Sequence, residues 1–338
     1  RYINSAVIKI GASTNTLIEE SEVYYCHRHG INIIRGNNVT ARRNYVNCRR
    51  HADITGGYAS HTPALGDEGL TFYRSNDGIA ENNIVESSEG LSSSGQRNRF
   101  YGNIAAADNR YGIWWFTNCT KDCTNLGYFC DGNYSENLVS LGSWNDGVRL
   151  KTCGNSVMKN STIIGPGNYG LHAWDDITTS GFYNSYTLTN SLIIGSHAIG
   201  FYEDLTIMYP SNPWSVDYIN LYNNTTASNP VTSNAYGTIT HKSTVDPRMN
   251  SCIVYVPATS PMKGAGLGGV DIGANIIYRY QNGEITTTKL WNQTTGSFPC
   301  GATVAGLNDA TTRTSIMDGA CINVHKILNV GFNGCPIP

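Results

Sequence analysis

The chain of 338 residues has a formal net charge of -2, and 14% of its residues are charged. This balance provides neither the broad basic field that nucleic acid requires nor an acidic tail, so we expect no nucleic-acid partner. No apolar run approaches the roughly 20 residues of a membrane-spanning helix, so we expect no membrane span. The 36 glycines, with abundant Asn, Ser and Thr, are typical of many short strands joined by tight corners.

An asparagine recurs before a short apolar run along most of the chain. The asparagines concerned are Asn4, Asn44, Asn83, Asn103, Asn137, Asn160, Asn190 and Asn223. The shortest spacings lie near the roughly 20-residue repeat of a β-solenoid, and the longer ones correspond to a repeat plus an inserted loop. Because an amide both donates and accepts hydrogen bonds, we expect these side chains to stack into a ladder from rung to rung.

A second repeat, a glycine followed by an alternating segment, lies between the asparagines. Its glycines are Gly30, Gly69, Gly90, Gly112, Gly147 and Gly170, with a looser copy beginning at Ala198. Successive side chains of a strand point to opposite faces, so the first and third residues after the glycine are predicted to face inside and the second and fourth outside. The predicted internal column is Ile31, Leu70, Leu91, Ile113, Val148, Leu171 and Ile199.

The outward positions of four consecutive rungs combine aromatic and basic side chains. They include Trp114, Phe116, Arg149, Lys151, His172, Trp174 and Tyr202, and Tyr73 lies on an earlier rung. At about 4.8 Å per rung, they form a predicted strip in which rings stack on sugars and cations pair with carboxylates. The predicted binding residues are Tyr73, Trp114, Phe116, Trp174 and Tyr202. The alternative is that long insertions, such as residues 117–131 or 203–217, cover the strip and make it a lateral core.

The ten cysteines follow no metal-ligand pattern. An even number of scattered cysteines favours disulfides and therefore an extracellular or cell-surface location. His51, Asp53 and His61 lie in one predicted insertion and are interpreted as part of a solvated loop, so no metal site is predicted.

We predict two regions, a parallel β-helix over residues 1–235 and a C-terminal region over residues 236–338 that packs on or caps it. Disulfides of Cys300, Cys321 and Cys335 are expected to staple the second region. The segment at Asn4 resembles that at Asn190, so Arg1 is expected to fall inside a rung, with an upstream segment cleaved or missing. The exposed strand edge would then be capped, covered by the tail, or paired end to end with copies of the same chain.

The rungs over roughly residues 1–230 resemble the right-handed parallel β-helix of the pectate-lyase-like superfamily. Residues 251–257, 264–280, 290–291 and 298–302 are similar to the tail of secreted bacterial β-helix repeat proteins. The resemblance implies an all-β fold, a right-handed parallel β-helix with long loop insertions and an irregular, disulfide-stapled C-terminal tail. It indicates secretion and fold rather than a reaction.

Polysaccharide lyases of this superfamily use a Lys or Arg base, often with Ca²⁺ held by acidic residues. Residues 148–155 resemble the Lys-bearing strand of the alginate and chondroitin lyase family. This resemblance implies that Lys151 is the base that removes the proton next to the substrate carboxylate. Where that family has an Arg one rung later, this chain has His172 and Trp174. No cofactor is expected otherwise, and Ca²⁺ only for a lyase.

A glycoside hydrolase would need two carboxylates facing each other across a cleft. Asp175 and Asp176 are adjacent, and neighbouring residues of a strand point to opposite faces, so we interpret them as a turn. Glu68, Glu89 and Asp146 each precede a repeat glycine. The polygalacturonase signatures do not occur in their usual order.

The predicted function is therefore that of a secreted or cell-surface β-helix protein without catalytic activity. It would bind an extended extracellular polysaccharide or build an extracellular assembly such as a filament or matrix. The alternative is a lyase that cleaves a uronate-containing polymer by β-elimination, with Arg149, Lys151 and His172 as catalytic residues. A glycoside hydrolase is the further alternative.

Overall fold

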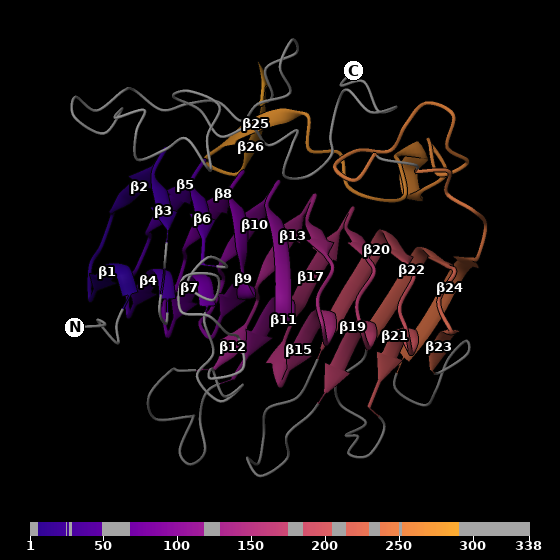
Figure 1. Ribbon diagram of the computed structural model, residues 1–338, viewed down its shortest axis with the longest axis horizontal. Helices are drawn as coiled ribbons and strands as arrows, with labels where there is room; N and C mark the ends of the chain where they lie inside the picture. Colours follow the sequence, from indigo (N-terminus) through magenta and orange to yellow (C-terminus); the bar gives the residue numbers. More distant parts are fainter. Residues whose placement is uncertain are drawn as a thin grey trace, which may run out of the picture.

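The computed structural model describes residues 6–24, 26, 29–48, 68–117, 129–174, 185–204, 214–229, 237–249 and 252–290. Twenty-two strands form one continuous parallel sheet that winds into a coil with three sides. The coil is right-handed, the sense in which parallel strands are almost always connected. Figure 1 shows the strands succeeding one another along the coil in the order of the sequence. The predicted right-handed parallel β-helix is confirmed.

Each side of the coil is a stack of strands, one from each rung. Side 1 consists of β1 (Ala6–Gly11), β4 (His29–Ile34), β7 (Glu68–Tyr73), the second half of β9 (Ile84–Ser93), the second half of β11 (Ile104–Phe116), β15 (Asp146–Lys151), β19 (Tyr169–Trp174), β21 (Ile199–Glu203) and β23 (Thr226–Asn229). This side contains the candidate site. The repeat glycine is the second residue of β4, β7, β15, β19 and β21 and holds the corresponding position in β9 and β11.

Sides 2 and 3 complete each rung. Side 2 consists of β2 (Leu17–Glu19), β5 (Thr40–Arg42), β8 (Ile79–Glu81), β10 (Arg99–Tyr101), β13 (Tyr134–Glu136), β17 (Ser156–Lys159), the first halves of β20 (Tyr186–Ile194) and β22 (Trp214–Tyr222), and β24 (Gly237–Ser243). Side 3 consists of β3 (Glu22–Tyr24), β6 (Tyr45–Asn47), the first halves of β9 and β11, β14 (Val139–Leu141), β18 (Thr162–Ile164) and the second halves of β20 and β22.

The interior of the coil is a column of apolar side chains, as the alternation after each glycine predicts. The first six predicted members are buried: Ile31, Leu70, Leu91, Ile113, Val148 and Leu171. The prediction for Ile199 is wrong, because Leu171 pairs with Phe201 and Ile199 pairs with Tyr169. The column therefore continues through Phe201, which is fully buried.

The repeat glycines allow neighbouring rungs to approach closely at the start of side 1. A Cβ on Gly112 would lie 2.7 Å from the carbonyl oxygen of Gly147 and 1.9 Å from Oγ of Ser140. Ser140 is a buried residue of side 3, so the missing side chain would point into the coil. Both the glycine and the residue after it therefore face inside, and the strict alternation of a strand is broken at this point.

Six of the recurring asparagines occupy two different columns, and Asn223 aligns with Gly195 at another corner. Asn44, Asn83 and Asn103 form the predicted buried amide ladder, in which each Nδ2 donates to the next Oδ1 at 2.9 Å. In the register of the strands, Leu138 aligns with Asn103, so Asn137 stands one position earlier. The expectation of one common ladder is therefore wrong for Asn137 and for the asparagines after it.

The second column is a corner with left-handed backbone conformation. Asn137, Asn160 and Asn190 have φ angles of 54°, 48° and 51°, and Gly102 has a φ of 61° in the same column. Asn tolerates this conformation better than most residues with a Cβ, which explains why Asn recurs here. The same residue type thus serves two structural purposes one position apart.

Residues 252–290 lie along the coil and run back toward its first rungs, as Figure 1 shows. Corner asparagines hold this segment: Asn190 accepts a hydrogen bond from the amide of Leu267, and Asn82 accepts one from the amide of Tyr280. β25 (Tyr278–Gln281) and β26 (Glu284–Lys289) form an antiparallel hairpin in it. Parallel strands of the coil continue to Ser243, and the division at residues 235 and 236 stays a prediction.

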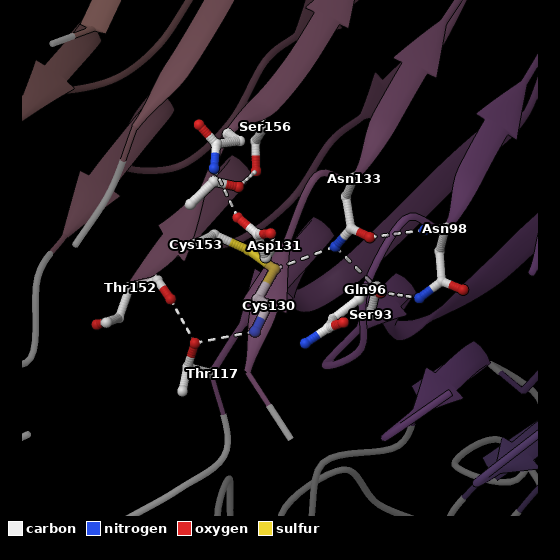
Figure 2. Close-up of a disulfide and its surroundings, with 12 residues drawn as sticks. Ser93, Gln96, Asn98, Thr117, Cys130, Asp131, Asn133, Thr152, Cys153 and Ser156 are labelled. Carbon is white, nitrogen blue, oxygen red and sulfur yellow. Dashed lines mark hydrogen bonds between the residues drawn. A yellow bond between two sulfur atoms is a disulfide. The ribbon is translucent and has the colours of Figure 1, made fainter. Parts of the chain in front are cut away.

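Disulfides fasten neighbouring rungs to each other. Cys26 bonds to Cys48, and Cys130 bonds to Cys153, with Cα atoms 4.6 and 4.7 Å apart. β12 (Cys130–Asp131) pairs with β16 (Cys153–Gly154) around the second disulfide. Figure 2 shows this disulfide beside Thr117, whose hydroxyl bridges the amide of Cys130 and the carbonyl of Thr152. The Cys130–Cys153 disulfide therefore links the connection that follows β11 to the one that follows β15.

The prediction of disulfides is confirmed for four of the ten cysteines in these two bonds, and Cys252 is also disulfide-bonded. The predicted staples at Cys300, Cys321 and Cys335 lie outside the described residues. So do Asn4 and Arg1, and the end-to-end pairing stays a prediction. No helix in the described part of the chain is long and apolar enough to cross a membrane.

Candidate functional site

The outward face of side 1 carries most of the residues that the sequence singles out. β11 supplies Trp114 and Phe116, β15 supplies Arg149 and Lys151, β19 supplies His172 and Trp174, and β21 supplies Tyr202. Trp114, Arg149 and His172 pair in register on three consecutive rungs. Phe116, Lys151 and Trp174 do the same two residues further along. The structure thus brings these predicted residues together as one strip.

Tyr202 occupies a different row from the predicted one. Counting from Ala198 predicts that Tyr202 lies in the row of Phe116, Lys151 and Trp174, on the rung after Trp174. In the structure Tyr202 pairs with His172 instead. The reason is the shifted register of β21, in which Phe201 takes the inward position. Tyr202 therefore continues the row of Trp114, Arg149 and His172.

Tyr73, at the end of β7, stands apart from the strip. Ser94 lies between Tyr73 and Phe116 in the register, so the two rings are two rungs apart. The guanidinium of Arg74 lies 5.1 Å from the centre of the Tyr73 ring.

Aromatic rings hold the two cations of β15 in place. The guanidinium carbon of Arg149 lies 4.8 Å from the ring centre of Tyr111 and 4.6 Å from that of Trp174. The ammonium of Lys151 lies 4.8 Å from the same Trp174 ring. Such contacts stabilise a cation without neutralising its charge. The predicted base Lys151 thus rests on an aromatic ring.

The remaining rings of the strip pack against one another. Trp114 and Phe116 stack with centres 3.9 Å apart, and Phe116 is buried at 5% exposure. Tyr202 stacks on Tyr169 at 4.6 Å. The strip is therefore partly a lateral core, as the alternative interpretation holds, while Trp114, Trp174 and Tyr202 stay partly exposed.

Three ring or guanidinium nitrogens in one row of the strip are buried without a hydrogen-bond partner among the described residues. They are Nε1 of Trp114, Nε of Arg149 and Nε2 of His172, and we call them the nitrogen row. Their residues pair in register on three consecutive rungs, whose strands are about 4.8 Å apart. Buried polar atoms are nearly always hydrogen-bonded, so unpaired nitrogens on three consecutive rungs mark this row as a candidate binding site.

An aspartate orients the histidine of this row. Nδ1 of His172 lies 3.0 Å from Oδ2 of Asp146, and Nη1 of Arg149 lies 3.7 Å from the same oxygen. Asp146 is 1% exposed, so its carboxylate is held in the protein rather than in water. A carboxylate at Nδ1 favours the tautomer protonated there, which leaves Nε2 of the neutral ring as a base.

Sequence reasoning named Asp146 only as an acid that precedes a repeat glycine and missed its part in the site. Regular alternation would place the residue before the glycine inside the coil. The break at the glycine turns this residue outward instead, and Tyr111 and Asp146 pair there. Tyr111 accepts a hydrogen bond from Arg149, and burial raises the pKa of the Tyr111 hydroxyl. The glycine column itself was the signal that could have placed them.

The earlier rungs of side 1 carry other side chains on the same face. Oε2 of Glu68 lies 3.2 Å from Nδ1 of His29. Glu89 pairs with Arg110 at 2.5 Å, where an irregularity in β11 between Ala107 and Tyr111 brings the arginine alongside. These acids are thus paired with cationic or titratable partners.

Among the described residues, no group of three or more His, Cys, Asp or Glu side chains is arranged to hold a metal ion. The predicted loop residues His51, Asp53 and His61 and the pair Asp175 and Asp176 lie outside the described residues.

Two solved structures are similar to this chain. No protein-family model matches the chain, and no curated protein matches it. The chain is similar to the crystal structure of the periplasmic alginate epimerase AlgG, with 14% identity and a TM-score of 0.46 over 68% of this chain and 50% of that one. It is also similar to the A-module of the mannuronan C-5 epimerase AlgE4 of Azotobacter vinelandii, with 13% identity and a TM-score of 0.49 over 68% of this chain and 60% of that one.

The chain is a right-handed parallel β-helix protein with an aromatic and cationic face on one side. It matches only half to three fifths of the length of the two epimerase structures. Function is therefore inferred from the face itself.

Proposed function

We propose that the outward face of side 1 binds an acidic extracellular polysaccharide lengthwise along the coil. The nitrogen row is the observation that carries this proposal. Trp114 and Arg149 offer N–H donors on consecutive rungs, and His172 adds a nitrogen on the next rung. A sugar chain is an extended ligand with oxygens at every unit, so it can satisfy such a row.

The charges of the strip favour an acidic chain over a neutral one. Arg149 and Lys151 lie side by side over Trp174, and each can pair with a carboxylate. The exposed parts of Trp174 and Trp114 offer apolar rings for sugar faces. A uronate-containing polymer combines these features in one repeating unit.

The disulfides support an oxidising location, which is where such polymers occur. The two described disulfides fasten adjacent rungs, a device suited to an extracellular or cell-surface protein. Filament or matrix assembly through end-to-end contacts is a separate proposal, which the face of side 1 does not require.

Titration calorimetry tests the binding proposal with polyuronates and a neutral polysaccharide at low salt. We expect the intact chain to bind a polyuronate and to bind the neutral polymer at least tenfold more weakly. Trp174→Ala is expected to weaken polyuronate binding, whereas Ile285→Ala, which removes an exposed apolar side chain in β26, leaves it unchanged. Absence of binding to every polyuronate at low salt would refute the proposal.

A second candidate function is β-elimination on the same polymer, and the Asp146–His172 pair is the observation that favours it. Nε2 of the neutral His172 would remove the proton on the sugar carbon next to the carboxylate, which Arg149 neutralises. The electron pair forms a carbon–carbon double bond as the bond to the glycosidic oxygen breaks. The leaving oxygen takes a proton from the Tyr111 hydroxyl, so no oxidant or metal is needed. His172 then takes the place that the lyase resemblance gives to Lys151.

Ultraviolet absorbance of the unsaturated product separates these possibilities. His172→Gln is expected to abolish product formation, while Lys151→Met lowers affinity and retains turnover. A variant pattern in which Lys151→Met alone abolishes turnover would restore Lys151 as the base. Binding with no unsaturated product from any polyuronate, with or without Ca²⁺, would leave a binding protein.

A further inference from the structure

Trp144 is the most exposed large apolar side chain of the described residues, at 74% exposure. It lies in the turn between β14 and β15, directly before Asn145 and Asp146. Elsewhere in the coil, Trp115 and Trp214 are buried in the core. A tryptophan held in water calls for a reason, because the ring loses the gain that burial would give it.

The backbone of this turn is firmly held. The amide of Asn145 donates to the carbonyl of Arg110 at 3.1 Å, and the amide of Gly167 donates to that of Ser143 at 2.6 Å. A Cβ on Gly167 would lie 2.0 Å from the carbonyl oxygen of Trp144, so the next rung presses directly on the turn. The Trp144 ring therefore projects into water from a fixed base.

The turn belongs to the same rung as the centre of the proposed binding face. Trp144 precedes Asp146 by two residues and Arg149 by five, which places its Cα at most roughly 18 Å from that of Arg149. The ring thus stands at the lateral edge of side 1, within reach of a sugar chain that contacts Arg149. It is not a member of the strip, whose residues follow the repeat glycines.

We propose that Trp144 forms an outer subsite that stacks on a sugar ring of the same acidic polysaccharide. The inference rests on the proposed function and adds a place on the coil where the polymer leaves the strip and crosses its edge. A rigid, amphipathic ring provides contact area at a low cost in conformational entropy. Only an oligosaccharide that spans from Arg149 to the edge can use this subsite, so its contribution depends on chain length.

Calorimetric titration with oligouronates of increasing length tests this subsite. We expect Trp144→Ala to raise the Kd of long oligomers by about 2- to 10-fold, the equivalent of one aromatic stacking contact, and to leave the Kd of a disaccharide unchanged. Trp144→Phe is expected to retain most of the affinity, and Ile285→Ala is the control for loss of an exposed apolar side chain. Thermal unfolding of each variant verifies that the fold is intact.

The outcomes separate the subsite from the binding face. If Trp174→Ala weakens all oligomers while Trp144→Ala weakens none, the outer subsite is refuted and the proposed function stands. An equal loss at every length on Trp144→Ala also refutes the subsite, because the ring would then act within the strip. If the unaltered chain binds no oligouronate of any length, the proposed function fails, and the subsite fails with it.

Discussion

Side 1 presents two kinds of surface at one structural position. In β7 and β9 the second residue after the glycine is Thr71 or Ser92, and the two hydroxyls are hydrogen-bonded to each other. In the next three rungs the same position holds Trp114, Arg149 and His172, and Nε1, Nε and Nε2 of these residues, respectively, have no hydrogen-bond partner in the described part of the chain. The five residues follow one another in register, so their backbones are paired in the same way.

This difference teaches that a β-helix separates folding from surface chemistry. The backbone hydrogen bonds and the inward column are repeated in every rung, and the outward side chain is free to vary. In β7 and β9 this position holds two hydroxyls that satisfy each other, while Oδ1 of Asn32 in β4 is buried without a partner in the described part of the chain. In the later rungs one buried nitrogen of each residue is unpaired in the described part of the chain, and aromatic and cationic side chains surround the row.

The first prediction concerns the shared core beneath both surfaces. Phe72 and Trp115 lie in the same inward column and are fully buried, with Ser93 between them in the register. Phe72→Ala and Trp115→Ala are each expected to lower the free energy of unfolding by about 3–5 kcal/mol, because each leaves a large cavity. Urea unfolding measures both losses. A loss confined to one of them would mean that the two regions do not share one core.

The second prediction compares two carboxylates that each contact a histidine. Asp146→Asn is expected to lower the rate of elimination by about 100-fold or more, because His172 loses the acceptor that fixes its tautomer. Glu68→Gln, which alters the contact with His29 in the early rungs, is expected to leave the rate unchanged. Initial rates on a polyuronate measure both, and a similar loss in the two variants would contradict a special role for the later rungs.

The third prediction converts a late rung into an early one. Arg149→Ser is expected to raise the Kd for a polyuronate by about 10- to 100-fold, which corresponds to the loss of a hydrogen bond to a charged group. Ser92→Ala, at the same position in β9, is expected to leave the Kd unchanged. Calorimetry measures both values. Equal affinities for the Arg149→Ser variant and the unaltered chain would contradict the distinction between the early and later rungs of side 1.

The smallest expected effect is a dependence of stability on pH. Burial raises the pKa of Tyr111, so its neutral form is favoured in the folded state. The stability that this provides is complete below the ordinary tyrosine pKa near 10 and is lost as the pH rises through the raised value. Above about pH 10, the free energy of unfolding of the Tyr111→Phe variant is therefore expected to fall less steeply with pH than that of the unaltered chain. Urea unfolding at pH 8 to 11 measures this free energy. The same dependence on pH in the variant and the unaltered chain would contradict the prediction.

Register explains both the successes and the errors of prediction from sequence. The repeat glycine and the alternation after it correctly placed the inward residues from Ile31 to Leu171 and the outward strip from Trp114 to Trp174. Ile199 was placed wrongly because its rung was aligned to Ala198 rather than to Gly200. Because side chains of a strand alternate between two faces, an alignment error of one residue assigns every side chain to the wrong face.

The asparagines show a second limit of sequence patterns. Asn103 and Asn137 precede similar apolar runs, yet one is a buried ladder member and the other a corner residue with a φ of 54°. Asn suits both places, because its amide can stack and its backbone tolerates the left-handed region. The residue type therefore could not distinguish the two columns.

The sequence by itself determined the coil, its inward column and the side that carries the aromatic and basic residues, because these depend on local periodicity. Only the tertiary structure decided that Asp146 faces outward and orients His172, and that Trp144 stands in water at the edge of the same rung. Both depend on close contacts between rungs at a corner. A glycine breaks the alternation of the strand at one of these contacts, and the turn of the next rung packs against the Trp144 turn at the other. Such contacts join residues more than twenty positions apart, and no local pattern records them.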